Sequence, residues 1–451
     1  MKRNSLWTSI AFGLITLNVH VHAQSLTLSA AYQKALVSDP ALQASEQALQ
    51  AGREKAIQGR SLFLPQVSFT ASVTAINSHA ESTLPPAFAA LAKPDTSGNV
   101  SQTAVQVVQP LINAGVSASK AQLSRQTEGA EIAWTAARQD LMKRVSEAYL
   151  GVIVATETQR VVDAEEASLG QQLERAQARF DIGLGKLTDV QEAQARHDGA
   201  LARQVSARSA SAQRVAQFEA LTGGQANSLS ALAPTASLQG PDPDLLIEWQ
   251  NRALTHNARI LSKRIEAAVA LADTRRYGLL SRPTLDLVGS YTVQDKDGDL
   301  SLLVSADHQR TSTVALQLKV PVFTGGNLSS REREALAKVK QAELELAAMQ
   351  RDVRLQVHEA FEAVKTAVAR LVALQASARS ARTAVEATTQ GRDIGIRTQL
   401  DVLDAQQRLF GSQQDLVQAR ADLLLGRVRL AWAAGELDED VLRRIDGELV
   451  P

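Results

Sequence analysis

The feature that most limits how this chain of 451 residues can fold is an internal repeat. The tripeptide Asp181-Ile182-Gly183 returns as Asp393-Ile394-Gly395, at an offset of 212. Five such pairs of segments occur in the same order in both halves, which indicates a duplicated structural unit rather than a shared composition. The other four pairs are Leu64–Phe69 with Arg282–Leu287, Val107–Ile112 with Leu318–Phe323, Asp189-Val190 with Asp401-Val402, and Leu221–Gly223 with Ala433–Gly435.

The first part of each copy predicts a helix followed by two strands. A helical stretch, at about 26–62 and again at about 242–280, stops at a proline, which lacks an N–H donor and disfavours helix in the preceding residue. Polar and apolar residues then alternate, as in Gln66–Thr74, which predicts a strand with two different faces. The predicted strands are 65–76 and 101–110, which ends at Pro110, then 283–293 and 311–321, which ends at Pro321.

The rest of each copy has the period of a helix. Residues 116–180 and 328–391 contain no proline and little glycine, and the second stretch has the apolar stripe of a coiled coil. A helix of this length extends about 100 Å. Glycine-containing turns at 183–185 and at 395 predict reversals into further long helices. The first repeat is predicted at 24–223, with its second long helix at 186–222, and a linker follows at 224–245. The second repeat is predicted at 246–435, with its second long helix at 398–434, and a tail follows at 436–451.

The first 23 residues are predicted to be a secretory signal peptide. Lys2 and Arg3 precede a largely apolar run from Leu6 to Val19, and Val21-His22-Ala23 offers small residues for cleavage before Gln24. An anchoring transmembrane helix is the alternative, but the run is short and is interrupted by polar residues. Cysteine is absent, which excludes disulfides, thiolate metal sites and a lipoprotein anchor.

Composition and motifs argue against nucleic-acid binding and against catalysis. The formal net charge is +0, so the chain has no basic excess for nucleic acid. The seven histidines are scattered without metal-ligand spacing, and neither a glycine-rich phosphate loop nor a G-x-S-x-G motif is present. We therefore expect no enzyme activity, no cofactor and no metal site.

The fold class expected is mainly α with a contribution to a membrane β-barrel. Strands of about ten residues suit a tilted membrane crossing, and open sheet edges are not tolerated in lipid. Four strands per chain cannot close a barrel, whereas three chains would supply twelve. A periplasmic or surface coiled-coil scaffold without a channel is the competing interpretation, which explains the helices but not the strands. The polar strand face would line a wet lumen with Gln66, Ser68, Thr70, Ser72, Thr74, Thr313, Gln317 and Lys319.

Two segments carry a resemblance to a known family. Arg179–Leu184 continuing through Thr188–Gln191, and Gly395–Ala405, resemble the periplasmic tip turns of the TolC family of trimeric outer-membrane channel-tunnel proteins. The similarity extends over essentially the whole mature chain. It implies a homotrimer whose twelve-stranded barrel, in outer-membrane lipid, continues into a twelve-helix coiled-coil tunnel in the periplasm.

The resemblance also implies a function. The family works as a passive exit duct in the Gram-negative outer membrane, docked to a periplasmic adaptor (membrane fusion) protein and to an inner-membrane pump of the ABC or the proton-driven type. The cargo, a protein in type I secretion or a drug or other small molecule in efflux, stays open, because specificity resides largely in the pump.

The resemblance assigns roles to residues of the second tip in particular. Asp401 and Asp404 match two aspartates that ring the closed pore, and at i and i+3 they share one helix face. The alternative interpretation is a pair of solvated surface acids. Because Asp404 adds a second acid, the second repeat is expected to carry the gate.

Further residues match the contacts that lock the tip. Thr188, Asp189 and Arg397 match polar lock residues, and Arg392 stands where the family's type member has a lock tyrosine. A guanidinium at 392 is expected to pair with Asp189. The exposed turns offered to an adaptor would be formed by Gly183, Leu184, Gly395 and Ile396, although the glycines also supply the positive φ that a reversal needs.

Overall fold

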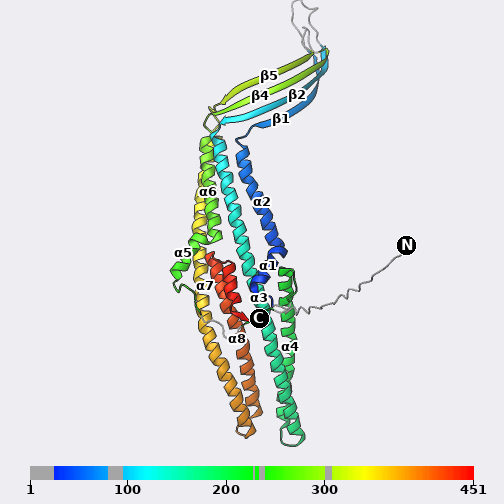
Figure 1. The fold of residues 1–451 in the computed structure, drawn as a ribbon, viewed down its shortest axis with the longest axis vertical. Coiled ribbons are helices and arrows are strands. Elements are labelled where there is room, and N and C mark those ends of the chain that lie inside the picture. The colour runs from blue at the N-terminus through cyan, green and yellow to red at the C-terminus, as the bar shows by residue number, and fades with distance from the viewer. Residues whose placement is uncertain (1–24, 80–94, 227–228, 233–238, 300–306, 451) are drawn as a thin grey trace, which may run out of the picture.

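The computed structural model describes residues 25–79, 95–226, 229–232, 239–299 and 307–450, so the predicted signal peptide lies outside the described residues. Figure 1 shows an elongated molecule with a curved sheet at one end, from which long helices run to two turns at the other end. In chain order the elements are α1 (Leu28–Ser38), α2 (Pro40–Ser61), β1 (Gln66–His79), β2 (Asp95–Ile112), α3 (Ala114–Asp181), α4 (Leu187–Thr222), β3 (Ala231–Leu232), α5 (Leu246–His256), α6 (Ala258–Leu279), β4 (Thr284–Asp299), β5 (His308–Lys319), α7 (Asn327–Asp393), α8 (Gln399–Ala434), α9 (Glu439–Asp446) and β6 (Leu449–Val450).

The large sheet is antiparallel, with the strand order β1-β2-β4-β5. Its register places Phe69 opposite Val105, Val105 opposite Tyr291, and Tyr291 opposite Ser312. Because successive side chains point to opposite faces, this register collects most of the large apolar residues of the four strands on one face. They are Val67, Phe69, Val73, Val105, Val107, Leu285, Leu287, Tyr291, Val314, Leu316 and Leu318. The residues predicted to line a lumen share the other face.

The strands are longer than the sequence pattern predicted. β2 has 18 residues and β4 has 16, because main-chain pairing continues beyond the stretch of apolar alternation. Pro110, which was expected to end a strand, lies within β2, where the pairing with β4 shifts register between Pro110 and Ile112. A proline has no N–H to donate to the ladder, and such a shift accommodates it.

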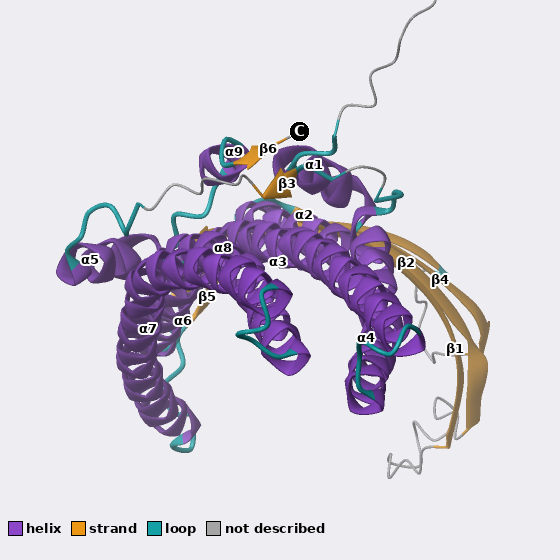
Figure 2. Ribbon diagram, turned by 90° about the horizontal axis from the view of Figure 1, so that it is seen from below, coloured by secondary structure: helices purple, strands orange, loops and turns teal. Residues whose placement is uncertain are grey.

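The helices form one curved layer. Figure 2 shows them side by side in an arc, with α1, α5, α9 and the small β3–β6 sheet on its convex side. α3 and α7, of 68 and 67 residues, are the longest helices that the structure describes. Buried apolar clusters around Tyr149 of α3 and Phe361 of α7 hold the layer together at mid-height. In the described part of the chain, no helix combines the length and the apolar character needed to cross a membrane.

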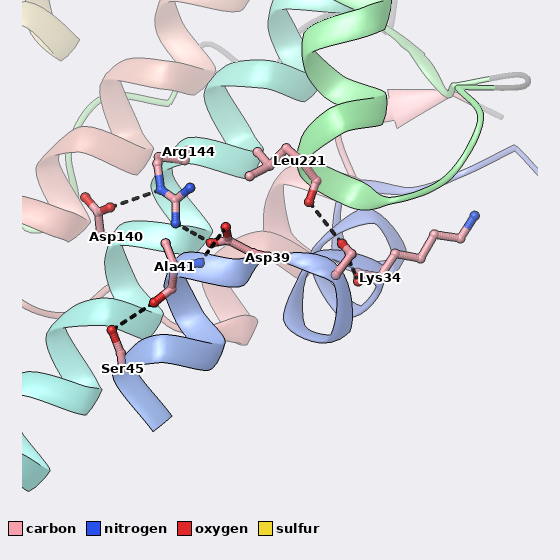
Figure 3. A network of polar contacts seen from close by, with 8 residues as sticks. Lys34, Asp39, Ala41, Ser45, Asp140, Arg144 and Leu221 are labelled. Carbon is pink, nitrogen blue, oxygen red and sulfur yellow. Dashed lines mark hydrogen bonds and ion pairs between the residues drawn. The ribbon is translucent and has the colours of Figure 1, made fainter. Parts of the chain in front are cut away.

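The sequence predicted one helical stretch at the start of the first repeat, but the structure breaks it between α1 and α2. Pro40 lacks the N–H that a continuing helix needs, and the Asp39 carboxylate caps α2 by accepting from the Ala41 N–H at 3.3 Å. Asp39 is only 5% exposed, and its other oxygen accepts from Arg144 Nη2 of α3 at 2.5 Å (Figure 3). Arg144 also donates to Asp140 at 3.1 Å. This partly buried charge pair holds the joint between α1 and α2 against α3. The second stretch also breaks, at Asn257, which caps α6 although no proline follows it.

The linker and the tail, predicted only to pack around the middle of the tunnel, contact each other and the start of the chain. β3 in the linker pairs with β6 in the tail. The Asp446 carboxylate accepts from the backbone N–H of Leu28 at 2.6 Å and of Ser29 at 3.0 Å, so the end of α9 caps the start of α1. Leu442 and Ile445 of α9 are buried in the cluster around Tyr149. The tail is therefore part of the core at mid-height.

We expect Asp446→Ala to lower the free energy of unfolding by about 1–2 kcal/mol, because two backbone donors of α1 lose their acceptor. The measurement is urea unfolding of the purified protein in detergent, followed by circular dichroism. Asp440→Ala is the matched control, because Asp440 lies on the same helix but only pairs with Arg443 at the surface. Equal shifts of the unfolding midpoint for both variants would contradict the role of Asp446 as a cap.

Candidate functional site

The two turns at the end of the helical layer repeat one geometry. In the first, the Leu184 N–H donates to Arg179 O at 2.8 Å and the Gly183 N–H donates to Phe180 O at 2.9 Å. The second repeats both bonds at positions 212 residues later, with φ of 74° at Gly183 and 80° at Gly395. This is a Schellman motif, in which a left-handed residue ends the helix. The glycines are therefore required by the backbone of each turn.

Each turn exposes apolar side chains to solvent. Leu184 is 71% exposed and Ile396 is 75% exposed. Ile182 and Ile394, which the sequence interpretation did not single out, are exposed to a similar extent. Their place in the repeated Asp-Ile-Gly tripeptide is the signal that could have identified them. Each tip thus presents two large apolar side chains, an arrangement that suits contact with a partner protein.

Asp401 is held by the start of its own helix. Its carboxylate accepts from the Thr398 N–H and from the Thr398 hydroxyl, each at 2.9 Å, and the Thr398 hydroxyl accepts from the Asp401 N–H at 3.1 Å. This reciprocal capping box begins α8. The hydrogen bond from the Thr398 backbone, followed by that from its hydroxyl, lowers the pKa of Asp401. The first tip lacks such a cap, because Lys186 precedes α4 without a side-chain bond.

Asp404, one turn further along α8, has a different environment. Its carboxylate accepts from Arg196 Nη2 of α4 at 2.9 Å. Arg196 also donates through Nε to Glu192 at 3.2 Å and through Nη1 to Gln407. Arg196 was missed from the sequence, although its place four residues after Glu192 on a helix was a usable signal. The two predicted pore acids are therefore not equivalent.

Arg392 joins the second tip to the first repeat, but through partners that were not expected. Its Nη1 donates to Gln172 Oε1 of α3 at 3.1 Å and to Gln399 Oε1 at 3.3 Å, and its Nη2 donates to Asp393 at 2.7 Å. The side chain is only 11% exposed. No hydrogen bond or ion pair among the described residues joins Arg392 to Asp189. All three guanidinium nitrogens have neighbouring acceptors, since Nε also donates to Asp393 at 3.1 Å.

The other predicted lock residues lie at the surface of the tips. Thr188 is exposed in the first turn of α4, and Asp189 beside it is partly exposed near the positive end of the helix dipole. Arg397 is exposed in the second turn, where its backbone N–H donates to Gly391 O at 3.0 Å. Within one chain these three side chains are not brought together with Arg392.

A small apolar cluster joins the two repeats beside these polar contacts. Leu403 of α8 is 1% exposed and packs in a cluster with Leu169 and Ala176 of α3 and Ala193 and Ala200 of α4. The small alanines allow the helices to approach closely, which fixes the face that α8 turns toward α4. The described residues include no group of three or more histidines and acids that could hold a metal ion.

We expect Thr398→Ala to weaken the start of α8, because the backbone N–H of Asp401 loses its acceptor. Hydrogen–deuterium exchange of residues 398–404 should then be faster at neutral pH, whereas Thr398→Ser, which keeps a hydroxyl, should retain the protection. Because the pKa of Asp401 is lowered, the carboxylate half of the cap is present above the ordinary aspartate range and is lost as pH falls through the lowered pKa. Unchanged exchange in Thr398→Ala would show that the capping box does not stabilise the tip.

Comparisons with known proteins agree with this geometry. The chain matches the family model described as outer membrane efflux protein at residues 31–224 and 249–436, which cover both repeats. It is 30% identical to an outer membrane protein TolC of Vibrio cholerae, with 98% of each chain covered. It is 28% identical to the alkaline protease secretion protein AprF of Pseudomonas aeruginosa, with 100% of this chain and 92% of the relative covered.

A solved structure shows the same fold. The outer membrane protein VceC of Vibrio cholerae superposes with a TM-score of 0.75 at 19% identity, over 91% of this chain and 97% of that one. The family model and the relatives together confirm the resemblance seen in the sequence. The chain belongs to the family of outer membrane efflux proteins, and it is a transport protein of the outer membrane rather than an enzyme.

Proposed function

We propose that three copies of this chain assemble into a passive outer-membrane exit duct, a twelve-stranded barrel continuous with a twelve-helix periplasmic tunnel. The observation that carries the proposal is the four-stranded sheet, which has one apolar face and two open edges. The competing coiled-coil scaffold gives no account of this sheet, and neither the family match nor the relatives favour it.

The sheet edges require neighbours. Among the described strands β1 and β5 each pair with one neighbour, so their outer main-chain groups need partners from other copies. In lipid each unpaired group would cost several kcal/mol, which only closure into a barrel avoids. The edge strands also expose large apolar side chains, with Val73 76% and Val314 80% exposed, which lipid would cover. The curvature of the sheet in Figure 1 is of the kind that closure needs.

The helical layer has matching open edges. α2 and α7 flank the upper half of the layer, and α7 exposes Leu336, Leu344 and Leu355 along its length. Apolar side chains at such intervals on one long helix suit packing against a helix of a second copy. Three arcs of the kind seen in Figure 2 would then enclose a tunnel on their concave sides.

The duct is gated at the tips in this proposal. Asp401 and Asp404 from three chains form a ring of acids at the constriction, where the negative potential favours cations. Arg392 acts as a lock residue through Gln172 of α3, and Thr188, Asp189 and Arg397 act across the tips. Because the ring of acids and Arg392 belong to the second repeat, the proposal agrees with the expectation that this repeat carries the gate.

Partners complete the proposal. The exposed turns at Gly183, Leu184, Gly395 and Ile396 dock to a periplasmic adaptor, which links the duct to an inner-membrane ABC or proton-driven pump. Relatives named for secretion of alkaline protease and of proteases, and one named as an efflux protein, fit cargo of either kind. The pump selects the cargo and supplies the energy.

The protein purified in detergent is expected to run as a heat-resistant trimer and to give discrete single-channel steps in planar lipid bilayers. Edge pairing between strands accounts for the heat resistance, since all chains must separate together. Trimer bands with and without boiling, recorded beside bilayer currents from the same preparation, are the measurement. A monomer without conductance would contradict the duct.

Arg392→Ala is expected to raise the conductance of the resting channel several-fold, because α7 loses its contact with Gln172 of α3 and only the bond from Gln399 of α8 remains. Arg351→Ala is the matched control, since Arg351 lies exposed on the same helix and pairs only with its neighbour Asp352. Bilayer conductance compares the two. A closed state as tight as that of the unaltered protein would show that Arg392 is no part of the lock.

A further inference from the structure

We propose that Arg196 is a selectivity-determining residue of the duct, which masks the charge of Asp404 while the tip is closed. In the closed state the open negative charge at the constriction then comes from Asp401. The proposal rests on the placement of Asp401 and Asp404 in the pore, as given under the proposed function.

All three nitrogens of the Arg196 guanidinium donate to neighbouring side chains. Nη2 donates to Asp404 Oδ1 at 2.9 Å, Nε donates to Glu192 Oε1 at 3.2 Å, and Nη1 donates to Gln407 Oε1. The side chain is 31% exposed and that of Asp404 is 45% exposed, so the pair is partly shielded from water. A charge-assisted hydrogen bond in this setting pairs most of the charge of Asp404 with the arginine.

The neighbouring residues hold this pair in place. Ala193 and Ala200 of α4 are fully buried in the cluster with Leu403, and Arg196 lies between them on the same helical face. Leu403 precedes Asp404, so the packing that buries the leucine also sets the position of the acid. Glu192 orients the guanidinium from its own helix, at i, i+4.

Among the described residues Asp401 forms no ion pair, and the positive charges of Arg397 and Arg408 affect it less than its hydrogen bonds do. Its carboxylate is held by the N–H and the hydroxyl of Thr398, which are neutral donors that stabilise the charge without cancelling it. The cluster of Glu192, Arg196 and Asp404 carries one negative charge in place of two. The two acids of the ring therefore differ in effective charge, although they lie one turn apart.

This arrangement couples selectivity to opening. If α8 moves away from α4 when the tip opens, the bond to Arg196 breaks and Asp404 regains its full charge at the pore. The preference for cations would rise as the pore widens. Arg196 thus acts on permeation through Asp404 rather than by contact with the permeating ion.

The test is the ratio of potassium to chloride permeability, from reversal potentials in a potassium chloride gradient across planar bilayers. We expect Arg196→Gln to raise this ratio at least two-fold and to have less than half of that effect in an Asp404→Asn background. Arg196→Lys, which keeps the charge, should change the ratio less than Arg196→Gln. Arg214→Gln is the control on the same helix, since Arg214 contacts only Gln217 there.

The outcomes separate this inference from the proposed function. If Asp401→Asn lowers the ratio while Arg196→Gln leaves it unchanged, the ring stands and the role of Arg196 is refuted. If neither Asp401→Asn nor Asp404→Asn changes the ratio, the placement of the acids in the pore fails as well. A heat-resistant trimer establishes that a variant assembles. If Arg196→Gln forms no such trimer, Arg196→Met is measured in its place.

Discussion

Along the outer edges of β1 and β5 lie main-chain N–H and C=O groups that no strand among the described residues pairs. The rest of the architecture depends on how these groups are satisfied. In lipid they must find partners in other strands, which sets the need for more than one chain and for a sheet curved enough to close. The helical layer follows the sheet, because α3 starts directly after β2 and α7 follows β5 after a short turn. The tips, where the gate is proposed, are therefore positioned by a constraint at the opposite end of the molecule.

Contacts at mid-height pack the two repeats against each other. α8 of the second repeat packs with α3 of the first, and the cluster around Tyr149 also takes in residues from α1 and α9. Burial raises the pKa of the Tyr149 hydroxyl to about 12, and this hydroxyl donates to Leu26 O at 2.7 Å. Asp446 then ties the end of the chain to its beginning. These contacts lie away from the tips, where a smaller apolar cluster around Leu403 and a few polar bonds join the two repeats.

The sequence predicted features that depend on local chemistry. The ends of the long helices followed from Gly183, Gly395 and the prolines, and the two sheet faces followed from alternation, because backbone sterics and side-chain direction act over a few residues. Features that depend on contacts between residues far apart in the sequence could not be predicted from it. Nothing near Asp446 indicates that it caps a helix 418 positions away, and nothing near Arg392 shows that Gln172 rather than Asp189 lies beside it. Pro40 was a local signal for the break between α1 and α2, but the helical pattern continues on both sides of it and indicated one helix.

The duplication has a consequence for how a gate of this kind can evolve. Arg196 contacts Glu192 in its own repeat and Asp404, the residue that stands 212 positions after Glu192. A ring of six identical half-chains would place the same acid and the same arginine at every junction between neighbours. Fusion of two halves into one gene leaves some junctions within a chain and the others between chains. Mutation can then alter one set alone, because Arg196, which serves the junction inside the chain, and its counterpart Arg408 in the second repeat are encoded separately.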